Sequence, residues 1–285
     1  MSETQIPSLM DRLKGRITKF EDTPITLNAV YYSESGVGKS TAAGIAPKPF
    51  IINCEGGTTC FLRLKKWMPQ LDIEVFKPEN FNEIRDAYAY LKNEKHDRQT
   101  VILDSLTEIA KMSMDGVLAD PRRDEKYDPE APVLQDQQKM TNQMRNLVRA
   151  FRDLPLNCIF VCLDQERQDQ TTGAIKVMPA LTPKLAEDVY GYMDVVGYMF
   201  VDPETGARKM LTQNRGKYIA KDRFGRLGAG MIEPTTYHLL NKITGLAVPT
   251  WVEEMYTQEL KKDQPKPVTA TIQAQAAKQE QGGKK

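Results

Sequence analysis

The part of this sequence that most restricts its possible folds is a short glycine-rich stretch, residues 33–41, which reads Ser-Glu-Ser-Gly-Val-Gly-Lys-Ser-Thr. Residues 25–32 before it are rich in β-branched and aromatic side chains, which predicts a strand. A short helix is expected over residues 40–45, because the prolines that follow would end it. A strand, a glycine-rich loop and a helix in this order form a phosphate-binding loop, with the pattern G-x-x-x-x-G-K-[ST]. Ser33 takes the place of the first glycine.

The residue types in this loop have a chemical reason. Gly36 and Gly38 let the backbone turn its N–H groups toward phosphate oxygens, and the following helix presents its positive N-terminal end to the same anion. Lys39 is expected to reach the β- and γ-phosphates, and Ser40 to give a hydroxyl to Mg²⁺. The loop therefore predicts binding of ATP with Mg²⁺, although a chance Gly-Lys-Ser turn is the alternative. The expected nucleotide-binding residues are Ser35, Gly36, Val37, Gly38, Lys39, Ser40 and Thr41.

Two acidic residues follow apolar runs that are typical of buried parallel strands. Asp104 ends the run at residues 101–103, where a carboxylate can hold Mg²⁺ directly or through water. The alternative is that it caps the helix predicted over residues 106–114. Glu55 follows the run at residues 50–53, where it could polarise an attacking water, or could be a turn residue before two glycines. We expect Asp104 to complete the magnesium site and Glu55 to be catalytic.

Further apolar runs alternate with helical patterns along the first part of the chain. Strands are predicted at residues 73–76 and 158–163, and amphipathic helices at residues 81–91 and 133–154. This alternation is typical of parallel crossover units. It predicts an α/β fold with a mostly parallel central sheet.

The pattern changes beyond residue 165. Residues 195–201 and 209–212 flank the turn sequence Asp-Pro-Glu-Thr-Gly, which predicts an antiparallel hairpin added to the sheet. Residues 115–132 are polar and contain three prolines, and are expected to form a loop. A final stretch rich in Gln, Lys, Ala and Pro is expected to be disordered. The expected organisation is an N-terminal segment (residues 1–23), an ATPase core (residues 24–260) and a disordered tail (residues 261–285).

Composition limits the classes of partner. The net charge is +1, so no global field would draw the protein to nucleic acid or to a membrane. The sequence has no apolar run of about eighteen residues, and its start lacks the apolar segment of a signal peptide, so a cytoplasmic protein without a membrane partner is expected. The cysteines match no zinc spacing and are expected to be reduced and buried. They are Cys54, Cys60, Cys158 and Cys162.

At these motifs the chain resembles the RecA-like P-loop ATPases. Residues 51–55 resemble the strand that carries the catalytic glutamate of RecA, and residues 103–107 contain an Asp-Ser pair common in that family. Residues 160–165 end at Gln165, where RecA-type proteins place a glutamine that senses the γ-phosphate. The chain is most similar to short, phage-encoded RecA-core proteins of single-strand annealing and recombination. The resemblance implies a RecA-like P-loop NTPase core, ATP hydrolysis, ring or filament assembly, and single-stranded DNA binding, in the host cytoplasm if the chain is phage-encoded.

A basic stretch at residues 208–226 contains Lys221-Asp222-Arg223, which resembles the K-x-R finger that RecA-like subunits insert into a neighbour's nucleotide site. In an extended segment, residues two apart point the same way, so both cations could reach one phosphate cluster. They could instead contact DNA phosphates, or lie on a solvated strand edge. The finger would make the protein a homo-oligomer. The expected catalytic residues are thus Lys39, Glu55, Gln165, Lys221 and Arg223.

Two functions from different classes follow. The first is a DNA-stimulated ATPase that acts on single-stranded DNA in recombination or annealing, with a single-strand-binding protein as a further candidate partner. Candidate DNA contacts are residues 166–176, the turn before Lys184, and Arg122, Arg123 and Lys126, although a surface hairpin without a ligand is an alternative for the first of these. The second is an ATP-switched loader or adaptor that acts on a protein partner without binding DNA. A metabolic kinase is a third and weaker interpretation.

Overall fold

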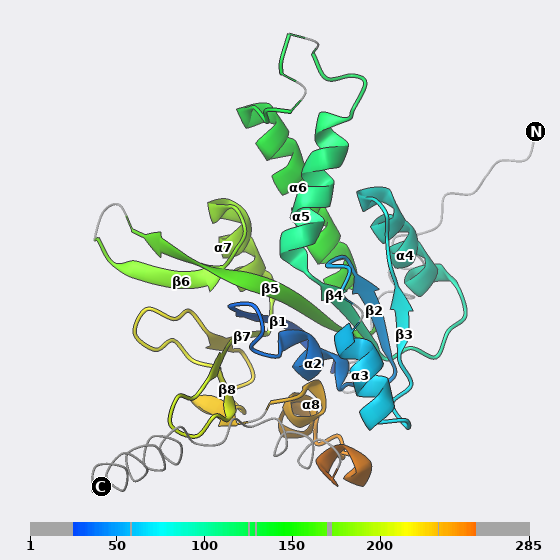
Figure 1. Ribbon diagram of the computed structural model, residues 1–285, viewed down its shortest axis with the longest axis vertical. Coiled ribbons are helices and arrows are strands. Elements are labelled where there is room, and N and C mark those ends of the chain that lie inside the picture. Colours follow the sequence, from blue (N-terminus) through cyan, green and yellow to red (C-terminus); the bar gives the residue numbers. More distant parts are fainter. Residues whose placement is uncertain are drawn as a thin grey trace, which may run out of the picture.

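The computed structural model describes residues 25–254, except for residues 58, 125, 129, 170–172 and 233. These residues form a three-layer architecture, in which helices cover both faces of one ten-stranded sheet (Figure 1). The predicted α/β class with a mostly parallel sheet is confirmed. The predicted N-terminal segment (residues 1–23) and the predicted disordered tail (residues 261–285) lie outside the described residues.

The centre of the sheet is parallel. In spatial order its strands are β1 (Asn28–Ser33), β5 (Asn157–Gln168), β4 (Thr100–Asp104), β2 (Pro49–Asn53) and β3 (Glu74–Phe76). Every residue of β2 and of β4 is buried, because helices cover both faces. This explains why these strands appear in the sequence as continuous apolar runs. The carboxyl ends of parallel strands meet at one edge of the sheet, and the polar residues that end β1, β2 and β4 lie there.

The other side of the sheet carries the antiparallel addition. β7 (Val195–Val201) pairs with β1 in parallel, and β8 (Arg208–Leu211) returns antiparallel to it, so the predicted hairpin is confirmed. β10 (Gly230–Ile232) continues the sheet beyond β8, and the short β9 (Lys221–Asp222) pairs with the start of β7. β6 (Ile175–Pro179) pairs with the distal part of β5.

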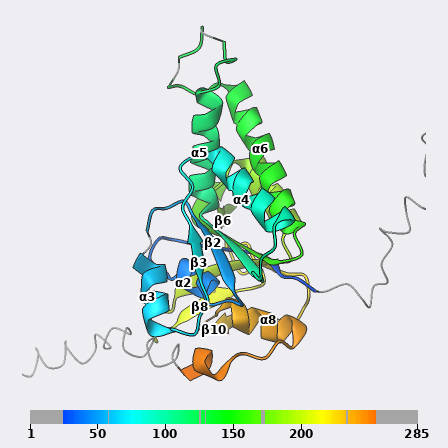
Figure 2. The ribbon, with the colours of Figure 1, turned by 90° about the vertical axis from the view of Figure 1, so that its right-hand side faces the viewer.

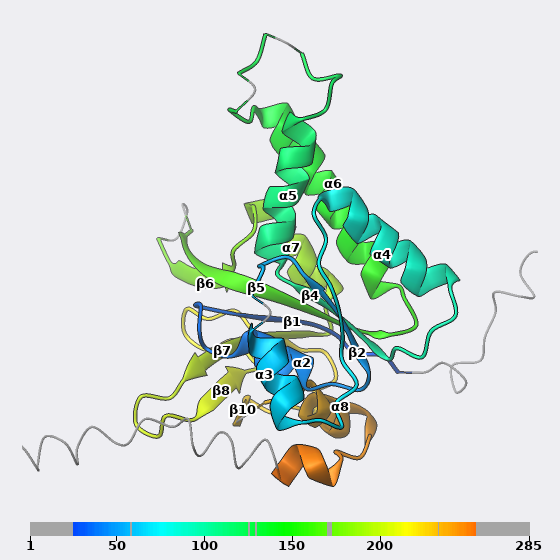
Figure 3. The ribbon, with the colours of Figure 1, turned by 45° about the vertical axis from the view of Figure 1, so that its right-hand side comes forward.

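Two helical layers enclose the sheet (Figure 3). One face is covered by α2 (Lys39–Gly44), α3 (Thr59–Trp67) and α8 (Thr236–Thr244). The opposite face is covered by α4 (Phe81–Asn93), α5 (Leu106–Leu118), α6 (Leu134–Arg152) and α7 (Pro183–Tyr192). Among the helices of the described residues, none combines the length and the apolar character needed to cross a membrane.

The helices α5 and α6 form a hairpin that extends well beyond the sheet (Figures 1 and 2). Near its far end the guanidinium of Arg123 lies 3.0 Å from the carboxylate of Asp136, and both side chains are buried. The same guanidinium donates to the backbone oxygens of Asp128 and Ala131, at 2.7 and 2.8 Å. Arg123, a candidate DNA contact, therefore organises the tip of this hairpin.

Two polar stretches contain more regular structure than their composition suggests. The loop at residues 115–132 begins later, because α5 continues to Leu118 and buries Val117 against the core. The polar stretch at residues 166–176 is largely a hairpin, as in the alternative given for it, because β5 continues to Gln168 and pairs with β6. Ladder hydrogen bonds satisfy the backbone of a strand whatever its side chains, so polarity alone did not reveal this extension.

Phe151 provides a test of the helical layer. It is fully buried on α6, and its ring meets that of Tyr88 on α4 edge-on, with 5.5 Å between the centroids. Phe151→Ala should lower the free energy of unfolding by about 3–5 kcal/mol, because the substitution leaves a cavity. Arg149→Ala, at an exposed position of the same helix, should change it by less than about 0.5 kcal/mol. Urea unfolding measures both, and equal effects would contradict this packing.

Candidate nucleotide-binding site

The glycine-rich loop lies where the sequence places it, between the end of β1 at Ser33 and the start of α2 at Lys39. Gly36 and Gly38 have φ angles of +83° and +102°, a left-handed region that glycine adopts without strain. Gly38 has a second constraint, because a Cβ there would lie 2.9 Å from Nε of Arg208 on β8. The backbone conformation therefore requires glycine at position 38, and any larger residue would also displace the side chain of Arg208.

Lys39 is buried and directed back over the loop. Its Nζ donates to the backbone oxygens of Ser33 and Glu34, at 2.9 and 2.7 Å, and lies 3.3 Å from Oγ of Ser33. Burial lowers the pKa of Lys39, and the charges of Glu55 and Asp104 oppose that shift. The serine that replaces the first glycine of the pattern thus gives the lysine an extra polar contact. Ser33 is compatible with the loop geometry.

An open cavity of about 480 Å³ lies over the loop. It brings Glu55 together with the predicted phosphate-binding residues, apart from Val37, which packs against the core beneath α2. Glu108, Cys60 and Leu163 also line the cavity and had not been expected there. The complete lining is Ser35, Gly36, Gly38, Lys39, Ser40, Thr41, Glu55, Cys60, Glu108 and Leu163.

Asp104 lies at the end of β4, only 3% exposed, and hydrogen-bonds to the hydroxyl of Ser40. Burial raises the pKa of its carboxyl from 3.8 to about 6; the Ser40 hydrogen bond and the charge of Lys39 oppose the shift, while Glu55 adds to it. Among the described residues, its Oδ1 has no hydrogen-bond partner. A buried carboxylate with a spare oxygen beside a hydroxyl is an oxygen donor set that suits Mg²⁺. Ser105, rather than Asp104, caps α5, through a hydrogen bond from the backbone N–H of Glu108.

Two glutamates face the cavity from different elements. Glu55 follows β2 and is exposed. Glu108 lies in the first turn of α5, where its carboxylate is 2.5 Å from Nζ of Lys111. The position of Glu55 above the loop is compatible with the predicted catalytic role, which stays a prediction.

Gln165 is not among the residues that line the cavity. It lies on β5 two residues beyond Leu163, and its amide donates to the backbone oxygens of Pro179 and Leu181, at 2.9 and 2.7 Å. In this arrangement its side chain is engaged by the segment that follows β6. Its predicted contact with the γ-phosphate would require the amide to leave those oxygens.

Lys221 and Arg223 lie at the opposite edge of the sheet, beside the amino end of β7. Nζ of Lys221 donates to the backbone oxygen of Tyr190 at 2.8 Å, and Arg223 donates to that of Gly191 at 2.9 Å. Arg223 also pairs with Asp194 at 2.6 Å. Both cations thus interact with the carbonyl end of α7, where positive charge is stabilising. Within one chain the structure does not bring them to the loop.

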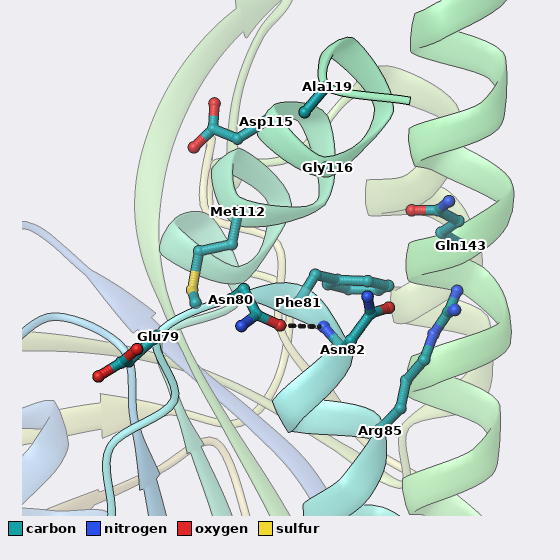
Figure 4. Close-up of a pocket in the computed structure, with 10 residues that line it drawn as sticks. All are labelled: Glu79, Asn80, Phe81, Asn82, Arg85, Met112, Asp115, Gly116, Ala119 and Gln143. Carbon is teal, nitrogen blue, oxygen red and sulfur yellow. Dashed lines mark hydrogen bonds between the residues drawn. The ribbon is translucent and has the colours of Figure 1, made fainter. Parts of the chain in front are cut away.

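A second cavity, of about 340 Å³, lies between the start of α4 and the facing sides of α5 and α6 (Figure 4). Asn80 caps α4 there by accepting from the backbone N–H of Asn82 at 3.0 Å, and Arg85 lies over the ring of Phe81. None of the described residues that line it belongs to the predicted site. The predicted nucleotide-binding residues that line a cavity do so over the glycine-rich loop.

Comparison with known proteins was informative at the level of the family. A family model described as "AAA domain" matches residues 26–224. The match begins at the strand before the loop and includes every predicted site residue from Ser35 to Arg223. No match was found among curated proteins.

The buried charge of Asp104 generates a prediction about stability. Because the native carboxyl has a pKa of about 6 rather than 3.8, stability is lost as pH rises through that interval. Asp104→Asn removes the charge, so it should stabilise the nucleotide-free protein at pH 7 by about 1–3 kcal/mol. It should also abolish Mg²⁺-dependent nucleotide binding. Urea unfolding at pH 7 and pH 4 tests this, and a gain that persists at pH 4 would contradict it.

Proposed function

The chain belongs to the AAA domain family, and from this premise we propose that it hydrolyses ATP with Mg²⁺ while acting on single-stranded DNA in recombination or annealing. The family indicates a nucleotide-binding ATPase-type domain in general. The ATP-hydrolysis part of the proposal is supported by one arrangement, the cavity that joins the glycine-rich loop to Glu55 beside the pair of Ser40 and Asp104.

Each residue of this arrangement has a proposed role. Lys39 would leave the backbone oxygens of the loop to contact the β- and γ-phosphates, and the N–H groups at the start of α2 would cradle the same anion. Ser40 directly, and Asp104 either directly or through a water molecule, would hold Mg²⁺, which would supply charge neutralisation at the phosphate oxygens. Glu55 would orient and deprotonate the attacking water.

Glu55 is preferred to Glu108 as the base because of their surroundings. Glu108 is held by Lys111 and lies in the capped first turn of α5. Glu55 instead precedes Gly56, which has a φ angle of +72°, in a connection that allows local adjustment when a nucleotide binds. The carboxylate of Glu55 is therefore the better candidate to approach the γ-phosphate.

Glu55→Gln should keep ATP affinity within about threefold and reduce the rate of hydrolysis by about 10²–10⁴-fold, because the amide cannot accept the proton of water. Glu108→Gln should have a much smaller effect, and Lys39→Ala should lose nucleotide binding itself. Equilibrium binding of a fluorescent ATP analogue and phosphate release measure the two properties separately. Full turnover in Glu55→Gln would reject the role.

The proposed DNA surface lies beside the β5–β6 hairpin, whose strand β5 also carries Leu163 of the cavity. The rings of Tyr218 and Tyr198 stack with centroids 4.3 Å apart, and Phe200 stacks on Tyr198 at 6.3 Å. Residues 217–219 run beside β6, since the N–H of Val177 donates to the oxygen of Lys217 at 2.8 Å. Aromatic rings near cations are the usual platform for unpaired bases. Tyr198 itself is buried and Phe200 is half-buried, so the support for DNA as the substrate comes from the half-buried ring of Tyr218, beside the exposed Lys217 and the β5–β6 hairpin.

The alternative, an ATP-switched loader or adaptor, is favoured by the charges on the same surface. Lys217 pairs with Glu166, and Lys176 lies 3.7 Å from Asp169. Cations that already have acidic partners attract phosphates less strongly. The proposal also includes assembly as a ring or filament. For Lys221 and Arg223 to act as a finger, they would have to leave the backbone oxygens at the end of α7 and contact the nucleotide of a neighbouring subunit.

A gel-shift assay with single-stranded DNA, with and without ATP and at two salt concentrations, separates the two functions. The double variant Lys176→Ala/Lys217→Ala should weaken binding by about tenfold and reduce its salt dependence, because two phosphate contacts are lost. Basal hydrolysis without DNA should not change. Lys242→Ala, an exposed cation on α8, is the control and should bind normally. Absence of DNA binding and of DNA-stimulated hydrolysis in the unaltered protein would favour the adaptor.

A further inference from the structure

Asn53, the last residue of β2, has a buried side-chain amide that makes no hydrogen bond with any described residue. Its side chain belongs to a residue that is only 2% exposed, and neither Oδ1 nor Nδ2 has a partner among the described residues. Leaving a buried polar atom unpaired destabilises the native state, so such groups are rare in native proteins. Asn53 therefore does not contribute to the stability of the fold through its amide, and its presence requires another explanation.

The position of Asn53 indicates what it serves. In the sheet register Asn53 lies directly opposite Asp104. Side chains alternate along a strand, and Ile51 of β2 and Ile102 of β4 both pack into the core beneath α2. Asn53 and Asp104, each two residues further on, face the same side. The unpaired amide and the unpaired Oδ1 of Asp104 are thus neighbours on the face that carries the glycine-rich loop.

The surroundings suit a small polar ligand. Asp104 hydrogen-bonds to Ser40 on one side. Cys60, at the start of α3, lines the cavity. Burial raises the pKa of its thiol to about 11, and the nearby carboxylate of Asp104 adds to that shift. An amide offers both a donor and an acceptor, which matches a water molecule rather than a bare cation. Mg²⁺ keeps several of its waters when it binds to proteins.

We propose that Asn53 is a positioning residue whose amide, together with Oδ1 of Asp104, holds a water ligand of the Mg²⁺ that accompanies the bound nucleotide. This inference rests on the proposed function, because it requires Mg²⁺ at Ser40 and Asp104. It accounts for an asparagine at the end of an otherwise apolar strand, where an apolar residue would be more stable. Outer-shell partners of this kind typically change metal affinity by about 10–100-fold.

The experiment compares Asn53→Leu with Thr100→Val. Thr100 begins β4 at the other edge of the sheet, and its Oγ1 is also buried and unpaired among the described residues. Both substitutions remove an unsatisfied polar group, but only one lies beside the site. The measurements are thermal unfolding without nucleotide, and the affinity for ADP in Mg²⁺ and in EDTA. Asn53→Ala is a second variant in case leucine is too large.

Asn53→Leu should raise the unfolding temperature of the nucleotide-free protein, and should reduce the gain in ADP affinity on adding Mg²⁺ by about tenfold or more. Its ADP affinity in EDTA should equal that of the unaltered protein, and Thr100→Val should keep the full Mg²⁺ effect. An unchanged Mg²⁺ effect, or an equal loss in EDTA, in both Asn53 variants would overturn the inference. If the unaltered protein itself shows no nucleotide binding or no Mg²⁺ effect, the proposed function fails instead.

Discussion

The burial of polar groups at one edge of a parallel sheet is the constraint on which this site depends. Asp104 and Asn53 end two neighbouring strands, with their side chains on the same face and without full hydrogen bonding among the described residues. Lys39 is buried nearby, and within the described part of the chain its Nζ donates to the backbone oxygens of Ser33 and Glu34. These groups oppose folding, because each loses water without full compensation. The two apolar layers offset this, and so the site can be prepared for an anion and a cation before either binds.

The phosphate-binding loop depends on contacts from the far end of the chain. α2 is only six residues long, too short to be stable alone. Thr236, at the start of α8, donates to the backbone oxygen of Ala43 at 3.2 Å and lies 3.2 Å from the hydroxyl of Tyr31 on β1. β8 adds Arg208 against Gly38. The elements after residue 200 therefore hold the loop from outside, which a local motif cannot reveal.

The sequence predicts those parts of the site and fold that depend on residues close together along the chain. Gly36, Gly38 and Lys39 were identified because a phosphate cradle fixes residue types at short spacing, and Asp104 because a fully buried strand precedes it. Asn53 gave no signal, since a polar residue ending an apolar run looks like the start of a loop. The helices α3, α7 and α8 were not predicted, because short helices depend on tertiary packing more than on propensity. The partners of Gln165, Lys221 and Arg223 are also tertiary contacts.

The path from the nucleotide cavity to the proposed DNA surface is set by β5. Leu163 lines the cavity, and the same strand continues through Gln165 to Gln168, where it pairs with β6. Gln165 fixes the end of that pairing by binding the oxygens of Pro179 and Leu181. Leu163 and Gln165 thus lie two residues apart on one strand that reaches from the cavity to the hairpin. The engaged state of Gln165 is therefore compatible with a sensing role, provided that the γ-phosphate competes with those two oxygens for its amide.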